Sequence, residues 1–432
     1  MEVSRRRFLG SSAAAVVAAG TMAKGKVFGA NDKVRICNIG IHGQGGSHIN
    51  DLLETEGFEV VALCDVDQRV LDSRVKEVEK KSGKAPKAYR DARDVMADDS
   101  IDAITIATPN HWHSLLAIWG CQAGKDVYVE KPLSHNVWEG RQLANAMKKY
   151  ERIVMHGTQS RSSSRWQRDI KLMRDGIIGR INMAKGFTYK TGNRMSIGVK
   201  PNEDPPEGLD WNLWQGPAQE QPFCKNYVHY NWHWFWIYGN GEIGNQGVHQ
   251  MDVAVWGLGK DGQLPVQAYS SGGRYAWEDQ AETPNTQTTT FTYDDGTMMV
   301  FEVRNLGSYQ EAGQTTGNHF LGDTGYYVQD QGFFDYRKNE PIPIPDGTEE
   351  PPGRSKWENF LNAIKSRKLE DCPCDGNIGH YSAAHCHIGN VAYRLKRSLN
   401  FDPKTERFVG DDEANAMLTR AYREPFVVPE IA

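Results

Sequence analysis

Apolar segments of strand length alternate with polar, helix-compatible segments along the first third of the chain. The apolar segments are Lys33–Ile39, Phe58–Cys64, Ile101–Ala107 and Asp126–Val129. The stretch Ser114–Ala123 between the last two has helical character and is followed by Gly124, a residue type that ends helices. Strands that alternate with helices are typical of a doubly wound parallel sheet. The sequence therefore predicts an N-terminal α/β domain over residues 31–155.

The pattern changes beyond about Gly179, where the apolar segments become longer. These segments are Ile181–Tyr189, Val266–Ser271, Gln287–Tyr293 and Met298–Val303. Asp294-Asp295-Gly296 supplies a hairpin turn between the last two. We expect a second α/β domain with an open, mostly antiparallel sheet over residues 156–410, followed by a helix and tail at 411–432. Residues 192–222, rich in Pro, Gly, Asn and Trp, form an irregular insertion of the kind that carries function.

Residues 1–30 have the order of an export signal. Ser4-Arg5-Arg6-Arg7-Phe8-Leu9-Gly10 is basic, an Ala-rich apolar run follows at Ser11–Ala19, and small residues stand near Gly29-Ala30. The arginine pair before Phe8 and Leu9 resembles the twin-arginine signal of bacteria, which implies export of a folded chain. The alternative, a chance basic N-terminus before an amphipathic helix, would not require this order. We expect an exported protein that is periplasmic, or membrane-associated through an uncleaved signal.

The length and charge of the chain limit its class. At 432 residues it is too long for one ordinary core, so two domains are expected. Charged residues make up 24% of the chain and the formal net charge is -5, which gives no reason to expect nucleic acid or an anionic membrane as partner. After the signal, no apolar stretch is long enough to span a bilayer. Cys37 and Cys64 lie inside strand patterns, which is typical of buried free thiols.

A glycine-rich turn follows the first predicted strand and leads into a helix-compatible stretch. Backbone N–H groups in such a turn, together with the helix dipole, face an anion such as a pyrophosphate. The dinucleotide-binding pattern has its middle glycine where His42 stands, and the neighbouring Gly43 is expected to restore the close backbone approach. We expect the following residues of the turn to bind the cofactor: Gly40, His42, Gly43, Gln44 and Gly45.

Asp65 stands at the end of the second predicted strand, about 20 residues beyond the turn. A carboxylate at this place binds the two hydroxyls of an adenosine ribose and repels a 2′-phosphate, which favours NAD over NADP. The alternative is a strand-end carboxylate in a solvated loop. Strand, glycine turn and acid together favour the cofactor interpretation.

Two further predicted strands end in polar turns, Thr108–His113 and Glu130-Lys131-Pro132. The ends of parallel strands meet at the edge where ligands bind. We therefore expect cofactor contacts from Thr108, Pro109, Asn110, His113, Glu130 and Lys131. Proline forces a sharp exit after Lys131, which holds this ammonium near the nicotinamide, where it can polarise a carbinol or carbonyl oxygen. A metal pair of His111 and His113 lacks a third ligand, so capping and packing are favoured and no metal is expected.

A glycine-rich run, Gly239–Gly247, leads into Val248, His249 and Asp252. If Asn245 begins a helix, Asn245 and His249 share one face at a spacing of four residues. A histidine that is neutral near physiological pH is a natural base for an alcohol that loses hydride. The alternative is a core histidine bonded to Asp252 or to backbone. Beside the cofactor turn and Lys131, catalysis is favoured.

Together, the glycine turn, Thr108-Pro109, Glu130-Lys131-Pro132 and the run into His249 resemble the Gfo/Idh/MocA oxidoreductase family. Further segments are similar to a branch common among exported bacterial members: Leu209–Trp211, Asn231–Trp234 and Asp411–Ala414. The resemblance implies an N-terminal Rossmann domain and a C-terminal α/β domain whose open sheet often forms an oligomer interface. It also implies hydride chemistry on sugars, cyclitols or their glycosides.

The resemblance implies roles for particular residues as well. Lys131 takes the place of the active-site lysine and His249 that of the catalytic histidine. Many members have an aspartate four residues before this histidine, where the chain has Asn245. An amide cannot accept a proton, so His249 must act alone or with another base. Asn245 and His249 are both expected to contact substrate.

The aromatic run Tyr227–Tyr238 is a candidate substrate surface. In one interpretation, Trp232 and Trp234 stack on the C–H faces of sugar rings. In the other, which is equally favoured, a Trp at every second residue forms the buried face of a core strand. Lys190 and Arg194, in or beside the irregular insertion, are placed to reach a substrate hydroxyl or carboxylate.

Three functions are consistent with these residues. The first is NAD-dependent oxidation of a secondary alcohol of a sugar, cyclitol or glycoside. The second is an NAD-dependent glycosidase or lyase that oxidises C3 transiently and eliminates the glycosidic substituent. The third is a sugar-binding protein without catalysis. An exported chain would carry NAD tightly bound, since its compartment has no nicotinamide pool, and a homo-oligomer, dimer or tetramer, is expected.

Overall fold

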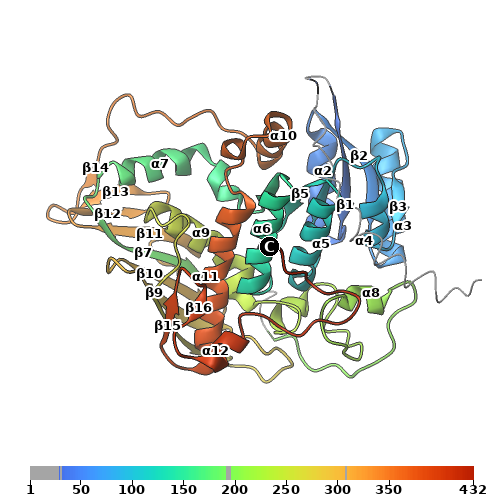
Figure 1. The fold of residues 1–432 in the computed structure, drawn as a ribbon. Helices are drawn as coiled ribbons and strands as arrows, with labels where there is room; N and C mark the ends of the chain where they lie inside the picture. The colour runs from blue at the N-terminus through green and yellow to red at the C-terminus, as the bar shows by residue number, and fades with distance from the viewer. Residues whose placement is uncertain (1–28, 30–31, 191–195, 307–308) are drawn as a thin grey trace, which may run out of the picture.

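A computed structural model of the chain describes residue 29 and residues 32–190, 196–306 and 309–432, which form two α/β units that lie side by side (Figure 1). The predicted export signal, apart from Gly29, and Arg194 lie outside the described residues.

The N-terminal unit contains a six-stranded parallel sheet in the described chain, with the order β3-β2-β1-β4-β5-β6. Its strands are β1 (Val34–Ile39), β2 (Phe58–Cys64), β3 (Lys87–Tyr89), β4 (Ala103–Ile106), β5 (Asp126–Val129) and β6 (Val154–His156). The predicted doubly wound sheet is thereby confirmed. Chain order reverses between β1 and β4, which opens a crevice at the carboxyl ends of these two strands.

Helices cover both faces of this sheet, and each face has its own apolar core. Helices α2 (Gly43–Glu54) and α3 (Gln68–Ser82) pack on one face. Helices α4 (Ala92–Ala97), α5 (Asn110–Gln122) and α6 (Val137–Lys149) pack on the other. Both cores draw on strand residues at alternating positions, such as Ile36 and Cys37 of β1.

The C-terminal unit contains a ten-stranded sheet in the described chain, with the order β14-β13-β12-β11-β7-β10-β9-β8-β15-β16. Its strands are β7 (Ile181–Thr188), β8 (Gln267–Gly273), β9 (Thr286–Thr292), β10 (Met298–Arg304), β11 (Thr316–Gly322), β12 (Gly325–Val328), β13 (Gly332–Asp335), β14 (Pro341–Ile342), β15 (Leu399–Asp402) and β16 (Arg407–Phe408). Strands β7 and β10 pair in parallel, whereas the remaining pairs are antiparallel. The predicted open, mostly antiparallel sheet is confirmed.

Helices α7 (Ser164–Arg174), α9 (Val248–Gly257) and α11 (Gly376–Leu395) pack on one face of this second sheet (Figure 1). The remaining segments are short: the helices α8 (Trp211–Gln215) and α12 (Asp412–Ala416), the 3₁₀ turns η1 (Gln159–Ser162), η2 (Asn231–Trp234) and η4 (Leu369–Asp371), and the π-helical turn η3 (Ile243–Gly247).

Two segments from the C-terminal half return to the N-terminal unit. Helix α10 (Lys356–Ser366) places Trp357 and Phe360 in the core beneath α2 and α3. The C-terminal tail places Phe426 and Ile431 in the core beneath α5 and α6. Segments that follow the predicted boundaries at 155 and 410 therefore complete the cores of the N-terminal unit.

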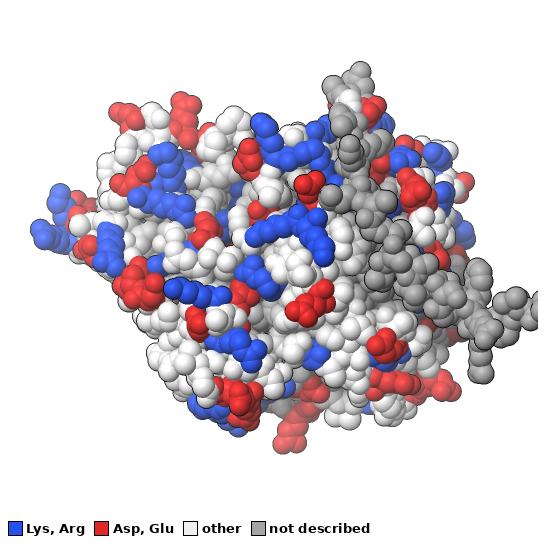
Figure 2. Space-filling view, viewed as in Figure 1, with Lys and Arg blue, Asp and Glu red and all other residues white. Residues whose placement is uncertain are grey.

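The surface shown in Figure 2 carries lysine and arginine interspersed with aspartate and glutamate. Within the described residues, no helix combines the length and the apolar character needed to cross a bilayer.

Candidate active site

A cavity of about 640 Å³ lies at the carboxyl ends of the parallel strands. Its walls come from the turns after β1, β2, β4 and β5, from residues 213–214 of the irregular insertion, and from residues 229, 230, 232 and 233 of the aromatic run. Asn245 of the second unit also lines it. The cavity is within the size range of cofactor and substrate sites, and it lies at the crevice that this topology opens.

The glycine turn after β1 is shaped for close backbone approach. Gly40 has a φ of +75°, and a Cβ there would lie 2.8 Å from the backbone nitrogen of Thr108. A Cβ at Gly45 would lie 1.8 Å from the carbonyl oxygen of Gly40. At Gly43, by contrast, a Cβ would meet no atom of the described residues within 4 Å. The start of α2 thus has the open space that a pyrophosphate needs at a helix N-terminus.

His42 occupies the position of the missing glycine and lines the cavity. Its ring stacks on His229 of the aromatic run, with ring centroids 4.6 Å apart and planes inclined by 15°. Nε2 of His229 lies 3.4 Å from a carboxylate oxygen of Asp67. The side chain at position 42 therefore connects the glycine turn to the aromatic run. Gln44, in the same turn, lines the cavity with its amide 3.3 Å from the His48 ring.

Asp65 lies at the end of β2 and lines the cavity, as predicted. Its two carboxylate oxygens accept hydrogen bonds from the backbone N–H groups of Ile41 and Asp67, each at 2.9 Å. Burial raises the pKa of Asp65 above its ordinary value, and these two hydrogen bonds oppose the rise. The carboxylate thus braces the turn, and its role at a ribose stays a prediction.

The turns after β4 and β5 are joined by His113. Its Nδ1 lies 2.7 Å from the carbonyl oxygen of Pro132, and its Nε2 lies 2.8 Å from that of Thr108. Within the described part of the chain, Thr108 Oγ1 and Asn110 Oδ1 are buried without a hydrogen-bond partner. Unpaired buried polar atoms are rare in folded proteins and call for a missing partner. The residues at this wall therefore fit a dinucleotide with polar groups to pair.

Lys131 follows β5 and reaches across to the second unit. Its Nζ donates to the backbone oxygen of Asn245 at 2.7 Å and to Oδ1 of the same residue at 3.1 Å. The preceding residue, Glu130, points the other way, with Oε1 lying 3.0 Å from Nε2 of His48. Burial alone would raise the pKa of Glu130, but the His48 contact and the Lys131 charge hold it well below its ordinary value. Glu130 is therefore ionised behind the lysine.

Asn245 belongs to the π-helical turn η3 rather than to the first turn of a regular α-helix. Its side chain donates from Nδ2 to Oε2 of Glu242 at 3.2 Å while Oδ1 accepts from Lys131. The amide thus fixes the direction of the lysine ammonium. Single π-turns within helices are frequent at functional sites.

His249 lies in the first turn of α9, directly after η3. The side chain is buried, and its Nδ1 has no hydrogen-bond partner among the described residues. Burial, followed by the positive charge of Lys131, lowers the pKa of His249 to about 3. The imidazole is therefore neutral at physiological pH and has a lone pair with which to accept a proton.

Two family models match this chain. Residues 34–158 match the NAD-binding Rossmann fold of the Gfo/Idh/MocA oxidoreductase family, and residues 167–428 match its C-terminal alpha/beta domain. The chain belongs to this family. Its residues 34–158 are thus an NAD-binding Rossmann domain of this oxidoreductase family, and the glycine turn lies within that domain.

Curated proteins of known sequence match this chain over only part of its length. A protein named glycosyl hydrolase family 109 protein from a Shewanella species is 30% identical over 154 residues, 35% of this chain and 34% of that protein. A protein of the same name from Shewanella baltica is 30% identical over 175 residues, 40% of this chain and 38% of that protein. The matched part therefore spans somewhat more than a third of the length of these curated relatives.

Solved structures match over most of the chain. The WlbA dehydrogenase from Bordetella pertussis, in complex with NADH and UDP-GlcNAcA, has a TM-score of 0.64 and 19% identity and covers 86% of this chain and 99% of its own. The aldose-aldose oxidoreductase from Caulobacter crescentus, complexed with glycerol, has a TM-score of 0.61 and 17% identity and covers 85% and 100%. These likenesses show the fold that this oxidoreductase shares.

The predicted substrate residues of this oxidoreductase fall in different places. Lys190 contacts Oε1 of Gln246, and its charge acts on His249. Trp232 lines the cavity, whereas Trp234 is buried and does not line it. The alternation of Trp residues, typical of a strand, instead forms the 3₁₀ turn η2. Arg194 lies outside the described residues.

Sequence reasoning missed several residues at the site. His229, Tyr230 and His233 line the cavity from the loop before and within η2. Glu242 orients Asn245, and it was detectable as the acidic residue in the glycine-rich run. The three loop residues lie in the aromatic run Tyr227–Tyr238 that the sequence indicated as a substrate surface, but there only the Trp residues were singled out.

Proposed function

We propose that this oxidoreductase removes hydride from a secondary alcohol of a sugar, cyclitol or glycoside, with NAD as the acceptor. One observation carries the proposal: the Lys131 ammonium is held by Asn245 at the wall of the cavity, and its charge acts on the neutral His249, which is buried behind that wall and does not itself line the cavity. A cation and a neutral base at one place are what an alcohol needs when it becomes a carbonyl.

Each side chain has one part in this reaction. NAD, when bound, supplies the acceptor for the hydride of the carbinol carbon. His249 accepts the hydroxyl proton through its neutral imidazole. Lys131 stabilises the negative charge that develops on the oxygen, and Asn245 keeps the ammonium at that position. The products are a ketone, a reduced cofactor and a protonated histidine that returns its proton to solvent.

The direct test is a product analysis with protein that has been loaded with NAD. A panel of aldoses, cyclitols and glycosides is incubated with wild type and with His249→Ala, and the products are identified by mass spectrometry. We expect one ketone for each reduced nicotinamide in wild type and a loss of at least about 100-fold in rate in the variant. Binding of a sugar without any turnover would instead support a sugar-binding protein without catalysis.

A second candidate function is glycoside cleavage, which the names of the Shewanella relatives favour. Oxidation of C3 to a ketone acidifies the C2–H bond, and a base that removes this proton expels the substituent from C1. Water then adds to the double bond, and return of the hydride to C3 restores the alcohol. His233 is the candidate for the additional base, since it lines the cavity with its Nδ1 2.6 Å from the carbonyl oxygen of Tyr230.

The two candidates differ in their cofactor balance. Oxidation consumes one NAD for each ketone formed, whereas cleavage releases an aglycone and leaves the cofactor unchanged. His233→Ala separates them further, since it should abolish aglycone release while transient reduction of the cofactor persists. A free aglycone produced by His233→Ala at the wild-type rate would remove this histidine from the mechanism.

We further propose that the NAD is held tightly, because the insertion is fastened over the turn after β2. The carbonyl oxygen of Gly208 accepts from the backbone of Gln68 at 3.0 Å and from Arg90 at 2.9 Å. The backbone N–H of Asp210 donates to Val66 at 3.0 Å. Desalted protein should therefore turn over a glycoside repeatedly without added NAD if the cofactor is recycled. Strict dependence on added NAD, with stoichiometric release of NADH, would contradict this.

We also propose that the protein is exported through the twin-arginine route. An exported protein would need to hold its NAD tightly, because its compartment has no nicotinamide pool. The double variant Arg5→Lys/Arg6→Lys should accumulate in the cytoplasm, whereas wild type reaches the periplasm or its membrane face. Equal distribution of the two in a cell fractionation would argue against this route.

A further inference from the structure

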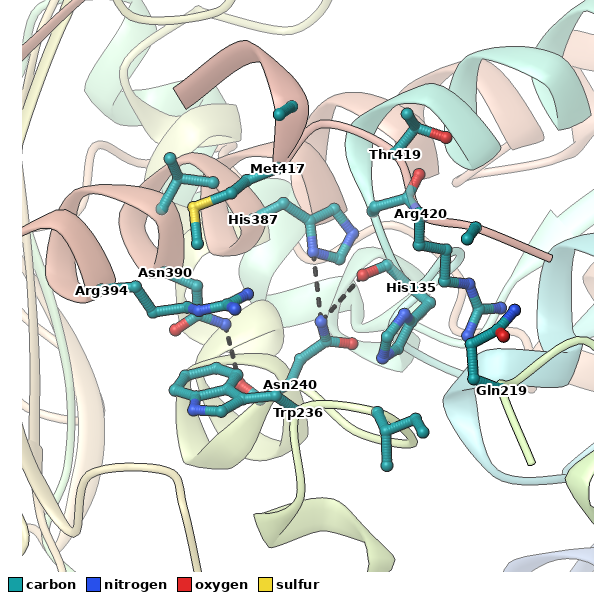
Figure 3. Close-up of a pocket in the computed structure, with 15 residues that line it drawn as sticks. His135, Gln219, Trp236, Asn240, His387, Asn390, Arg394, Met417, Thr419 and Arg420 are labelled. Atoms are coloured by element: carbon teal, nitrogen blue, oxygen red, sulfur yellow. Dashed lines mark hydrogen bonds between the residues drawn. The ribbon is translucent and has the colours of Figure 1, made fainter. Parts of the chain in front are cut away.

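A second cavity, of about 340 Å³, lies between α11, the segment 416–421 after α12, and the loop before η3 (Figure 3). It has no lining residue in common with the catalytic cavity. The side chains that define its chemistry are His135, Trp236, Asn240, Asn390, Arg394 and Arg420. His135 and Asn240 come from the segments that also carry Lys131 and Asn245, so this cavity lies behind the catalytic one.

The charge on the wall of this cavity is positive. Arg394 and Arg420 line it, and no aspartate or glutamate does among the described residues. Arg394 forms no ion pair within the described chain, and its guanidinium carbon lies 5.2 Å from the centre of the Trp236 ring. Burial lowers the pKa of Arg394, but a guanidinium remains charged at neutral pH. A cation at the wall of a cavity without a carboxylate partner there favours an anionic ligand.

Arg420 lies at the other side of the cavity, where it forms an ion pair with the buried carboxylate of Glu139. Its Nε donates to Glu139 and its Nη2 to the carbonyl oxygen of His111, both at 2.8 Å. Its Nη1 is buried without a partner in the described part of the chain. The arginine is therefore fixed in position and retains hydrogen-bonding capacity.

Uncharged polar groups of the wall are also incompletely paired. The amide of Asn240 donates to the carbonyl oxygen of His135 and that of Asn390 donates to the backbone oxygen of Asn240, each at 2.9 Å (Figure 3). Oδ1 of both asparagines and Nε2 of His135 are buried without a partner among the described residues. Each unpaired buried atom of this kind costs about 1–3 kcal/mol. A ligand with several hydroxyl groups would pair with them after small side-chain rotations.

We propose that this cavity binds a monosaccharide-sized anion, a sugar acid or a sugar phosphate. The volume lies at the lower end of the range for small-molecule sites and suits one ring rather than a dinucleotide. Arg394 pairs with the carboxylate or phosphate, the asparagines and histidine pair with hydroxyls, and Trp236 faces the C–H groups. This inference does not depend on the reaction at Lys131.

Isothermal titration calorimetry on the NAD-loaded protein tests this site. The titrants are D-glucuronate, D-glucose 6-phosphate, neutral D-glucose and inorganic phosphate. Binding of at least one of the two anionic sugars is expected, with neutral glucose and inorganic phosphate much weaker. Arg394→Gln should weaken the anionic sugar by about 10-fold or more, since a charge-assisted hydrogen bond is lost. The matched control is Arg407→Gln, which removes an exposed arginine of β16 and should leave the affinity unchanged.

The variants also locate the binding event. Lys131→Ala should retain the affinity, because Lys131 lines only the catalytic cavity. Stronger binding of glucuronate or of glucose 6-phosphate shows whether the site prefers a carboxylate or a phosphate group. No binding of either anion, equal binding of neutral glucose, or equal binding of inorganic phosphate would overturn the proposal. Loss of binding in Lys131→Ala but not in Arg394→Gln would place the anion in the catalytic cavity and would also overturn it.

Discussion

The ammonium of Lys131 is the residue on which the proposed chemistry depends, and its partner is an amide rather than a carboxylate. Asn245 accepts two hydrogen bonds from it without neutralising its charge. The positive charge of Lys131 helps to keep the pKa of His249 low, at about 3, in addition to the effect of burial. The amide therefore preserves both the electrostatic strength of the lysine and the neutral state of the histidine.

Asn245→Asp should raise the pKa of His249 and lower the rate. A carboxylate beside Lys131 cancels part of its positive charge, which favours the imidazolium and weakens stabilisation of the oxyanion. Activity requires neutral His249, so the acid limb of the kcat/KM profile should move to higher pH. The control is Asn202→Asp, the same charge change at an exposed position, which should leave the profile unaltered. An unchanged acid limb in Asn245→Asp would mean that Asn245 does not set the charge at this site.

Asp65→Ala should reduce the preference for NAD over NADP by about 10-fold or more, since the carboxylate favours a free ribose and repels a 2′-phosphate. The residue also holds the backbone N–H groups of Ile41 and Asp67, so the variant should unfold at a lower temperature. Dissociation constants for both cofactors are measured, and their ratio cancels the shared loss from a distorted turn. The exposed Asp72→Ala is the control. An unchanged ratio would place Asp65 away from the ribose.

At the scale of elements, the π-helical turn η3 sets the position of Asn245. Gly247 ends this turn against β10, where a Cβ would lie 2.5 Å from the ring of Phe301. Gly244 is similarly close to Asn240, because a Cβ at Gly244 would lie 2.5 Å from the Cβ of that residue. Small residues are thus needed to bring the turn close enough to the sheet for Asn245 to meet Lys131.

Gly247→Ala should displace η3 from β10 and reduce turnover more than it reduces NAD affinity. The added methyl group overpacks the contact with Phe301, at a cost of about 1–3 kcal/mol in the free energy of unfolding. Steady-state kinetics, NAD binding and thermal unfolding are compared with Gly353→Ala, where the nearest atom would be 3.8 Å away. Wild-type kcat in a destabilised Gly247→Ala protein would show that the position of η3 is not critical.

Local pattern was sufficient to predict some elements and not others. The strand, turn and helix around Gly40 and the turn that carries Lys131 are specified by neighbouring residues, and they formed as expected. Strand β3 has three residues that are largely exposed, and strands β12 to β14 are only two to four residues long, so none of them is long enough to show a periodic apolar pattern. The π-turn depends on contact with Phe301, and His229 is placed through His42 and Asp67. Such long-range contacts leave no periodicity in the sequence.

At the scale of the whole molecule, α10 and the C-terminal tail fasten the two units together. The side chain of Asn145 donates to the carbonyl oxygen of Ile431 at 3.1 Å, and the backbone N–H of Ile431 donates to Gln142 at 2.6 Å. The two units are therefore expected to unfold as one.

Acid should destabilise the protein below about pH 6.5. Burial lowers the pKa of five histidines to about 3 or 4: His111, His156, His249, His385 and His387. In the unfolded chain each ionises near 6.5, so between these values the unfolded state binds more protons and stability falls as pH falls. Each group contributes at most about 1.4 kcal/mol per pH unit.

Urea unfolding at a series of pH values measures this effect. The free energy of unfolding should decline steadily from about pH 6.5 toward pH 4, and His385→Gln should flatten the decline if the variant folds. Constant stability across this window would mean that these histidines are not neutral in the folded protein.

The proposed roles of Lys131 and His249 in oxidising an alcohol are tested most directly by a single turnover of NAD-loaded protein. The protein is mixed rapidly with a sugar or glycoside that carries hydrogen or deuterium at the carbinol carbon, and reduced nicotinamide is followed by its absorbance. Wild type and the exposed-site control Lys368→Ala should show a burst that deuterium slows. Lys131→Ala and His249→Ala should retain NAD but lose at least about 100-fold in the rate of the burst. A burst of unchanged rate in these two variants, or no reduction with any sugar or glycoside, would contradict the account.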